Sequence, residues 1–372
     1  MTEQIEYKVL ARKYRPQTFA DLIGQETLVQ ILSNAITTNR IANAYLLTGV
    51  RGVGKTTTAR LIAMSLNCEN KKEDSCEPCG TCESCKSIRS DHNLDVIEMD
   101  AASKTGVDDV REIIDNVKYK PVNCKFKIFI IDEVHMLSKS AFNALLKTLE
   151  EPPEHVKFIF ATTEVKKIPV TILSRCQRFD LKRVESKDLI QHIKRISELE
   201  KVKIDDGAIS LLVRAGDGSV RDSLSLLDQA IINTDSIVSA ETVENMLGLA
   251  DRGKIYDLLG FIAKGEASES LDLFRNLYNS GADILMIFEE LLNVIHSITQ
   301  IKISPDIQKD ISIPELERVK GSEYATQLSM NSLSLMWQVL FKGFQELQNG
   351  FHLFQHGEMI IVRLIFINNS PQ

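Results

Sequence analysis

The sequence predicts an α/β protein with a parallel sheet, followed by two modules built only of helices. Apolar runs rich in β-branched residues alternate with helical patterns early in the chain, and a glycine-rich phosphate-binding pattern follows the first run. Beyond about residue 182 only helical periodicity is found. Parallel strands covered by helices on both faces are apolar throughout, as these runs are. We expect an α/β domain at 1–182, a small helical domain at 183–247 and a longer one at 248–372.

The phosphate-binding loop is the sharpest motif. The pattern G-x-x-x-x-G-K-[ST] is met by Gly49, Val50, Arg51, Gly52, Val53, Gly54, Lys55 and Thr56. A predicted strand at 44–48 precedes it and a predicted helix at 57–66 follows, which is the setting the motif requires. Backbone N–H groups and the helix N-terminus then face an anion. We expect Lys55 to reach the β- and γ-phosphates and Thr56 to hold Mg²⁺.

The remaining elements follow in regular order. Pro16 and Gly24 punctuate a loop before the first predicted helix, at 25–38. After the phosphate loop, strands are predicted at 95–99, 127–131 and 157–162, with helices at 107–117 and 138–150. Pro152 and Pro153 end the second of these helices. Four short helices are expected within 186–246, and helical patterns continue from about 250 to 368.

Two carboxylates end the strand at 127–131. Asp132 at the strand tip is suited to hold Mg²⁺, directly or through water, and Glu133 to polarise an attacking water. An acidic pair at a strand end is otherwise a solvated turn, but the preceding phosphate loop favours the catalytic interpretation. Thr162 and Thr163 end the next strand, where a hydroxyl could orient water; ordinary β-propensity explains them equally well.

Five of the seven cysteines lie close together: Cys68, Cys76, Cys79, Cys82 and Cys85. An odd, clustered set in a chain without an export signal favours a metal site over disulfides. Cys79, Cys82 and Cys85 are spaced for one metal, and Cys68 would complete a tetrahedral, structural zinc site. Cys76 is left over, although it could pair with Cys79. An iron–sulfur cluster and unligated thiols are the alternatives.

Composition limits the function classes. The chain has 372 residues, a net charge of −7 and a pI of about 5.6. This length suggests roughly two to three domains. The acidic balance excludes DNA binding by bulk charge, so any DNA contact needs a local basic surface. Neither a membrane-length apolar run nor a signal-peptide core is found in the sequence, so we expect a cytoplasmic protein without membrane contact.

The order of these motifs resembles that of AAA+ ATPases of the clamp-loader type. Besides the loop and the acidic pair, the resemblance rests on Thr163, on Ser174-Arg175-Cys176 and on the segment 218–222. The cysteine insertion and the segments 11–19 and 143–153 narrow it to the gamma/tau family of the bacterial DNA polymerase III clamp loader. The close similarity covers roughly 5–246; the remainder matches in helical character alone.

This resemblance implies a role for each site residue. It implies an ATP site in which Arg15 and Pro16 lie near the adenine and Thr57 extends the phosphate loop. Thr163 would be the first sensor, Arg221 the second, and Arg175 an arginine finger offered to a neighbouring subunit. The implied zinc ligands are Cys68, Cys79, Cys82 and Cys85, with Cys76 as a departure from the family pattern.

The resemblance also implies architecture and partners. An AAA+ domain would be followed by a lid domain and a helical collar that joins the delta, delta-prime and further gamma/tau subunits. The assembly would open a sliding clamp and load it onto primed DNA irrespective of sequence. Lys104 and Arg111 are the candidate contacts to the DNA backbone, a solvated helix face being the alternative. The sequence leaves open whether residue 372 is a natural end or a longer tau form continues.

Three rival functions share parts of this pattern. A DExH-type helicase is suggested by Asp132-Glu133-Val134-His135, but it needs a second α/β lobe. A scaffold with ATP as a structural ligand would not need Lys55, Thr56, Asp132 and Glu133 together. A replication initiator or helicase loader is disfavoured by the cysteine insertion and by the lack of a duplex-binding module.

Overall fold

The computed structural model describes residues 7–72, 75–234, 237–247, 252–304 and 315–368. The chain forms two compact units: Met1–His192 with Val213–Asp228, and Ile193–Leu212 with Gln229–Gln372. The expected domain boundary between residues 247 and 248 lies next to residues that are not described. Residue 372 is also outside the described ranges. The division into three domains therefore stays a prediction.

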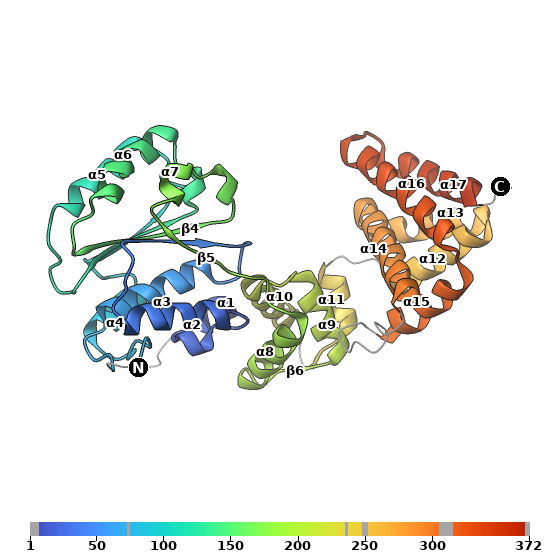
Figure 1. Cartoon of the computed structure of the whole chain (residues 1–372). Coiled ribbons are helices and arrows are strands. Elements are labelled where there is room, and N and C mark those ends of the chain that lie inside the picture. The colour runs from blue at the N-terminus through green and yellow to red at the C-terminus, as the bar shows by residue number, and fades with distance from the viewer. Residues whose placement is uncertain (1–6, 73–74, 235–236, 248–251, 305–314, 369–372) are drawn as a thin grey trace. The chain divides into compact units, whose positions relative to one another are not determined.

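A five-stranded parallel sheet organises the first unit (Figure 1). Its strands, in the order β2-β3-β4-β1-β5, are β1 (Ala44–Thr48), β2 (Val96–Asp100), β3 (Lys127–Asp132), β4 (Val156–Thr162) and β5 (Gln177–Asp180). Thr48 pairs in register with Thr162, and Asp100 with Asp132. The strand ends therefore meet at one edge, which is where ligands bind in open α/β sheets.

Helices cover both faces of this sheet, as the apolar strands require (Figure 1). On one side lie α2 (Glu26–Thr37), α3 (Lys55–Asn67) and α4 (Glu83–Arg89), and on the other α5 (Val107–Val117), α6 (Lys139–Glu150) and α7 (Val170–Leu173). Successive β1 side chains alternate between two cores: Tyr45 and Leu47 pack on the α3 side, Leu46 on the α6 side. All three are fully buried.

Short helical turns connect these elements: α1 (Leu10–Lys13), η1 (Phe19–Asp21), η2 (Val134–Met136) and η3 (Val165–Lys167). Four helices follow the sheet: α8 (Ser186–Leu199), α9 (Asp206–Ala215), α10 (Val220–Ile232) and α11 (Ala240–Leu247). In the second unit β6 (Lys203–Ile204) pairs with β7 (Ile237–Val238). The Asp205 carboxylate joins the same two segments, accepting from the amides of Ala208 and Ala240.

The second unit continues entirely in helices within the described residues. They are α12 (Arg252–Lys264), α13 (Ala267–Asn279), α14 (Ile284–Ile303), α15 (Glu315–Gln327), α16 (Met330–Asn349) and α17 (Leu353–Asn368). Their core holds large buried side chains such as Tyr256, Phe274 and Phe288. Among the described helices α14 alone is long and apolar enough to cross a membrane, yet ten of its residues are buried in this core. That burial is typical of a core helix.

Several sequence predictions are confirmed and some are wrong. The strand at 44–48 and the helix at 107–117 have the expected bounds. The expectation of no strand beyond residue 182 is wrong, because β6 and β7 exist, each of two residues. β5 was not predicted because it is an edge strand with one buried apolar residue, Phe179. α15 lies within the range predicted as helical, although its apolar residues form no regular stripe.

Candidate active site

Three glycines shape the phosphate loop between β1 and α3. Gly49, Gly52 and Gly54 have φ values of 149°, 77° and 102°, in the region that side-chain-bearing residues rarely adopt. A Cβ atom on Gly52 would lie 1.9 Å from the Ser219 hydroxyl oxygen. The loop therefore depends on glycine for its turn and for its packing against the segment that leads into α10.

Lys55 places its charge inside this loop. Its ammonium group donates to the carbonyls of Gly49 and Val50, both at 3.0 Å. Burial lowers the pKa of Lys55, while the nearby carboxylates of Glu133 and Asp132 raise it. The loop thus carries a buried cation at the start of α3, where helix N–H groups also favour an anion.

Thr56 and Asp132 meet at the sheet edge. The Thr56 hydroxyl donates to Asp132 Oδ2 at 2.6 Å, joining the first turn of α3 to the tip of β3. A hydroxyl and a carboxylate are the oxygen donors that Mg²⁺ uses beside substrate phosphates. The two residues therefore fit a magnesium site shared with a nucleotide.

Glu133 follows directly and reaches the end of β4. Its backbone has a φ of 46°, uncommon for a residue other than glycine, and turns the chain from β3 into η2. Glu133 Oε2 accepts from the Thr163 amide at 3.2 Å and from the Thr163 hydroxyl at 3.1 Å. The structure thus brings together the loop, the acidic pair and Thr163.

The N-terminal segment and α10 approach the same loop. Arg15 Nε donates to the Thr57 hydroxyl at 3.1 Å, and Pro16 follows half-buried. Burial lowers the pKa of Arg15, and the positive charges of Arg60 and Arg221 act in the same direction. The Arg221 amide donates to Gly52 O at 3.3 Å, which holds the start of α10 at the loop.

Arg175 makes its contacts elsewhere. Its guanidinium pairs with Glu150 at the end of α6 and donates to the carbonyl of Thr171. The side chain is about one-third exposed. Its contacts are thus on the α6–α7 side, and it is not among the residues that the hydrogen bonds above gather at the phosphate loop.

The cysteine insertion forms a compact group. The Sγ atoms of Cys68, Cys79, Cys82 and Cys85 all lie within 4.8 Å of one another. The amides of Cys79, Cys82 and Cys85 donate to the sulfurs of Cys68, Cys79 and Cys82 at 3.2, 3.2 and 3.4 Å. Hydrogen bonds from the backbone amides of Thr81 and Cys82 to its sulfur lower the pKa of Cys79 to about 6. Such bonds favour thiolates and orient metal ligands, so the donor set fits a tetrahedral metal.

Cys76 lies outside this group of four sulfur atoms. It is buried, and its carbonyl accepts a hydrogen bond from the Ser65 hydroxyl of α3. The next residue, Glu77, accepts from the amides of Phe19 and Ala20 at 2.8 and 3.0 Å. The Cys76–Glu77 segment therefore fastens the insertion to α3 and to the N-terminal segment.

Comparison with known proteins agrees with this geometry. Family models match at 24–185 (DNA polymerase III, delta subunit), 188–236 (DNA polymerase III clamp loader subunit, ATPase lid domain) and 238–372 (DNA polymerase III subunits gamma and tau domain III). The DNA polymerase III subunit gamma of Buchnera aphidicola subsp. Baizongia pistaciae is 37% identical over 372 residues, covering 99% of both chains. The chain belongs to the DNA polymerase III gamma/tau family.

Longer members of the gamma/tau family are also similar. The subunit tau/gamma of Haemophilus influenzae is 42% identical over 97% of this chain and 51% of its own length. The subunit tau of Escherichia coli is 43% identical over 92% of this chain and 53% of its own length. This gamma/tau chain therefore spans about half the length of those two relatives.

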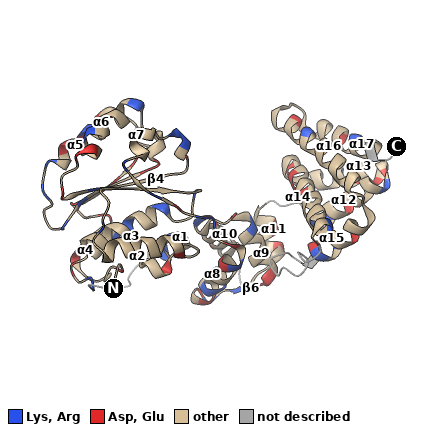
Figure 2. Ribbon diagram, viewed as in Figure 1, with Lys and Arg blue, Asp and Glu red and all other residues tan. Residues whose placement is uncertain are grey.

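The candidate DNA contacts of this gamma/tau chain lie beside acidic groups. Arg111 pairs with Asp108 on the same exposed face of α5, and Asp109 also lies in the first turn. Lys104 is exposed before the helix. Figure 2 shows acidic and basic segments together on α5. A DNA role for Lys104 and Arg111 stays a prediction.

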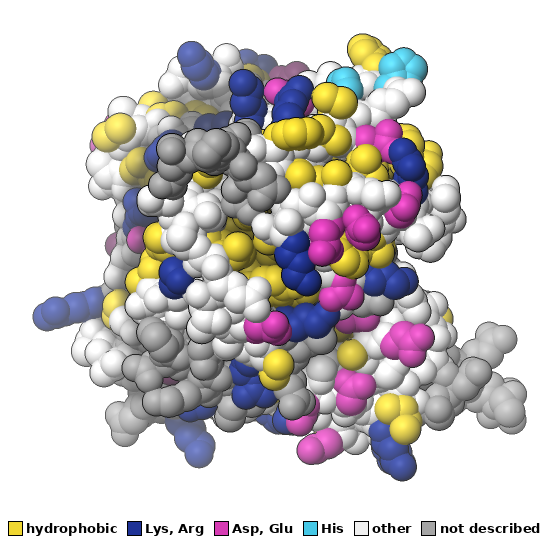
Figure 3. Space-filling view, turned by 90° about the vertical axis from the view of Figure 1, so that its right-hand side faces the viewer, with side chains coloured by type: hydrophobic (Ala, Val, Ile, Leu, Met, Phe, Trp, Pro, Cys, Tyr) yellow, Lys and Arg dark blue, Asp and Glu magenta, His cyan; other side chains and the backbone are white. Residues whose placement is uncertain are grey.

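Hydrophobic side chains are exposed on the C-terminal helices of the gamma/tau chain. Figure 3 views the molecule from that side and shows hydrophobic side chains gathered among charged ones. Leu335, Trp337 and Phe341 of α16 are among the exposed large apolar residues. Trp337 and Phe341 lie one helical turn apart on the same side of α16, whereas Leu335 lies on another side.

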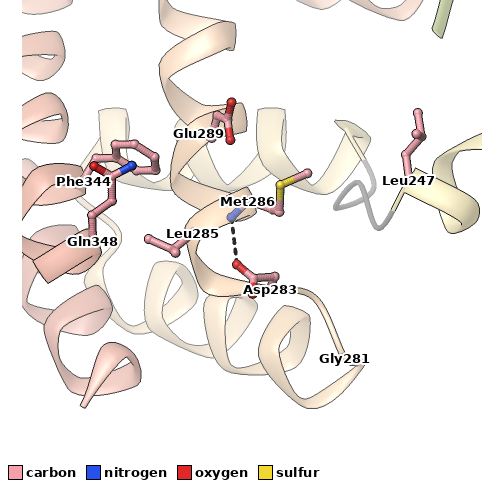
Figure 4. A pocket seen from close by; sticks show the side chains of 8 residues that line it. All are labelled: Leu247, Gly281, Asp283, Leu285, Met286, Glu289, Phe344 and Gln348. Atoms are coloured by element: carbon pink, nitrogen blue, oxygen red, sulfur yellow. Dashed lines mark hydrogen bonds between the residues drawn. The ribbon is translucent and has the colours of Figure 1, made fainter. Parts of the chain in front are cut away.

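An open hollow in the second unit lies between α11, the start of α14 and α16 (Figure 4). Met286, Glu289 and Phe344 line it, and Asp283 caps α14 by accepting from the Met286 amide at 3.2 Å. Of its polar lining, Asp283 is engaged in helix capping.

Sequence reasoning missed two residues of the gamma/tau site. His135 lies between the carboxylates of Glu133 and Glu164. His135 belongs to the Asp132–His135 run, which the sequence alone connects only with the helicase alternative. Glu77 gave no signal, because its partners lie 57 and 58 residues away in the chain.

Proposed function

We propose that this chain is the ATP-hydrolysing motor subunit of a replicative clamp loader within DNA polymerase III. The observation that carries the proposal is the 2.6 Å hydrogen bond between Thr56 and Asp132, which joins the phosphate loop to the β3 acidic pair. A phosphate-binding loop alone would fit a nucleotide-binding scaffold. A loop joined to a metal-binding carboxylate with a neighbouring base fits phosphoryl transfer.

The residues around the loop would have separate roles in ATP binding and hydrolysis. Lys55 and the loop amides would bind the β- and γ-phosphates, and Thr56 and Asp132 would hold Mg²⁺. When bound, Mg²⁺ neutralises charge on the phosphate oxygens. Glu133 would take the proton of the attacking water, and Thr163, hydrogen-bonded to it, would orient the same water.

Three arginines and Pro16 would complete the nucleotide site. Arg221, held at Gly52 by its amide, would contact the γ-phosphate of the same chain. Arg15 and Pro16 would border the adenine, next to Thr57 in the first turn of α3. Arg175, whose contacts lie on the α6–α7 side, would serve as the arginine finger of a neighbouring subunit's site. A positive charge supplied from the neighbour stabilises the transition state only in the assembly.

Zinc would be the resident metal of the cysteine group. Four sulfur atoms within 4.8 Å of one another, with three amide-to-sulfur hydrogen bonds among them, support this assignment. Four thiolates leave no open position, so the site would be structural. Cys76, engaged through its backbone carbonyl, would remain outside it.

The partners follow from family membership. The C-terminal helical module would join the delta, delta-prime and further gamma/tau subunits, and the exposed apolar residues of α16 support an interface there. ATP binding would tighten the assembly so that it opens a sliding clamp and holds primed DNA by its backbone. Hydrolysis would release both. The family models at 24–185, 188–236 and 238–372 support the division into a nucleotide-binding, a lid and a collar domain. A cytoplasmic location fits this role.

Nucleotide titration tests the proposal. With Mg²⁺ present, the full chain should bind ATP, and Lys55→Ala should weaken binding strongly without unfolding the protein. Turnover in the assembly with partner subunits excludes the scaffold alternative. A strand-separation assay with the chain alone should give no unwinding, because the described residues beyond β5 form no second α/β lobe. Unwinding would favour the helicase alternative.

A further inference from the structure

His135 is the one ionisable residue of the Asp132–His135 run to which the proposed function gives no role. Its side chain is only 6% exposed although it follows the sheet edge directly. The left-handed backbone at Glu133 turns the chain sharply enough that η2 carries the imidazole back over the end of β4. A buried imidazole beside a catalytic carboxylate can fix the position of that carboxylate.

The two ring nitrogens face different groups. Nδ1 lies 3.0 Å from the Thr162 hydroxyl oxygen and 3.3 Å from Glu133 Oε2. Nε2 lies 3.5 Å from Glu164 Oε1. Thus Nδ1 alone reaches the general base proposed above, and Nε2 faces a half-exposed carboxylate.

Thr162 is a fixed partner for Nδ1. It is fully buried, and its hydroxyl oxygen also accepts from the Glu164 amide at 3.0 Å. Thr163, the next residue, donates to Glu133 Oε2 from both its amide and its hydroxyl. Glu133 is therefore flanked on two sides: Thr163 donates to its carboxylate, and the imidazole, hydrogen-bonded to Thr162, lies 3.3 Å from the same carboxylate oxygen.

We propose that His135 is a positioning residue that holds the Glu133 carboxylate through Nδ1 and so ties the base to the end of β4. This inference rests on the proposed function, since Glu133 has a base to position only if the chain hydrolyses ATP. The tautomer that serves this role carries its proton on Nδ1, which lies 3.0 Å from Thr162 Oγ1 and 3.3 Å from Glu133 Oε2. The nearby charged groups are Glu133 and Glu164, and Lys167 pairs with Glu164.

Two substitutions separate the ring nitrogens. His135→Asn puts an amide nitrogen near the position of Nδ1, whereas His135→Gln puts one near the position of Nε2. A role through Nδ1 predicts that the Asn variant keeps most of the turnover while the Gln variant loses about 10- to 100-fold in kcat, the cost of misplacing a reacting group. ATP affinity should be unchanged in both. Glu164→Gln, which alters the Nε2 partner and its ion pair with Lys167 but no contact of Glu133, should leave kcat near the wild-type value.

Turnover is measured under single-turnover conditions in the assembly with partner subunits, sliding clamp and primed DNA. Hydrogen exchange at the Thr163 amide is measured on the full chain without nucleotide. It should be faster in His135→Gln than in wild type and unchanged in His135→Asn. Thermal unfolding of each variant reports on packing alone.

Each outcome decides the inference. Equal loss of kcat in both variants, wild-type kcat in both, or unaltered Thr163 exchange in His135→Gln would overturn it. If the wild-type assembly does not hydrolyse ATP, the proposed function fails; the exchange pattern then still shows whether His135 fixes Glu133.

Discussion

Glu133 has a strained backbone conformation. The Glu133 backbone φ of 46° is costly for a residue with a side chain. Thr163 donates two hydrogen bonds to its carboxylate, and His135 Nδ1 lies 3.3 Å from it. Strain of this kind at the end of a strand is common where a side chain must face a ligand.

Glu133→Gln should separate binding from hydrolysis. The amide keeps the size of the side chain but cannot accept the proton of water, so kcat should fall by about 10²- to 10⁴-fold while ATP affinity is retained. Nucleotide titration and turnover in the assembly measure the two effects. Glu154→Gln, on an exposed turn, is the matched control. Unchanged turnover in Glu133→Gln would assign the base to another group.

Asp95 gives a prediction about stability and pH. It is 1% exposed and accepts from the amides of Val122, Asn123 and Cys124 at 2.8, 2.8 and 2.9 Å. Burial raises the pKa of Asp95, but these amides outweigh it, and the pKa lies below its ordinary value. The folded-state pKa is thus lower than the unfolded-state value. The stabilisation is present above the unfolded-state pKa and is lost as pH falls through the folded-state pKa.

Asp95→Asn should therefore lower the free energy of unfolding at pH 7 by about 1–3 kcal/mol, since the buried amides lose their charged acceptor. The difference from wild type should shrink below about pH 4, where the unfolded-state carboxyl becomes protonated. Urea unfolding across this pH range measures it. A difference that stays constant with pH would contradict the assignment.

At the scale of elements, the N-terminal segment is clamped at two points. Arg15 bonds to Thr57 in the first turn of α3, and Glu77 of the cysteine insertion accepts from the amides that open η1. Cys68 follows the last residue of α3, and Ser65 near that end bonds to the Cys76 carbonyl. The cysteine group and the proposed adenine border are therefore joined through α3 and Glu77.

Loss of this clamp should loosen the segment. In Glu77→Ala, or after treatment with a chelator that would remove the proposed zinc, amide exchange at Phe19 and Ala20 should rise and ATP affinity should fall. The exchange rates should return when zinc is restored to the wild-type protein. Glu83→Ala, in the same insertion but without a bond to η1, is the control. Wild-type exchange at both amides in Glu77→Ala would exclude the clamp.

Most elements could be predicted from the sequence because their residues carry the pattern themselves. The helix at 107–117 has a regular apolar stripe, and β1 is five consecutive buried residues. β5 could not be predicted because pairing with β1, rather than its own composition, makes it a strand. The phosphate loop and the acidic pair were likewise predictable as local motifs, whereas the contacts of His135 and Glu77 depend on the folded arrangement.

At the scale of the whole molecule, ATP hydrolysis by the proposed mechanism requires a neighbouring subunit. Arg175→Ala should leave ATP binding by the chain unchanged and lower turnover in the assembly by about 10³- to 10⁵-fold. Arg178→Ala, which changes a half-exposed arginine paired with Asp180 of its own chain, is the control. Weakened ATP binding by the isolated Arg175→Ala chain would place the residue in its own site instead.

The C-terminal helices were predicted as helices, but their role could not be read from residue patterns. Their core is made of common apolar side chains, and only family membership assigns them to gamma and tau domain III. Residue motifs therefore predict the nucleotide site. The role of the C-terminal helices in subunit assembly is tested by experiment.

The most direct measurement is ATP turnover by the assembled complex, with and without sliding clamp and primed DNA. The account predicts turnover that rises when both are present and is lost in a complex whose gamma/tau chains carry Lys55→Ala. Equal turnover by the wild-type and Lys55→Ala complexes, or none in the wild type with clamp and DNA present, would contradict the central claim.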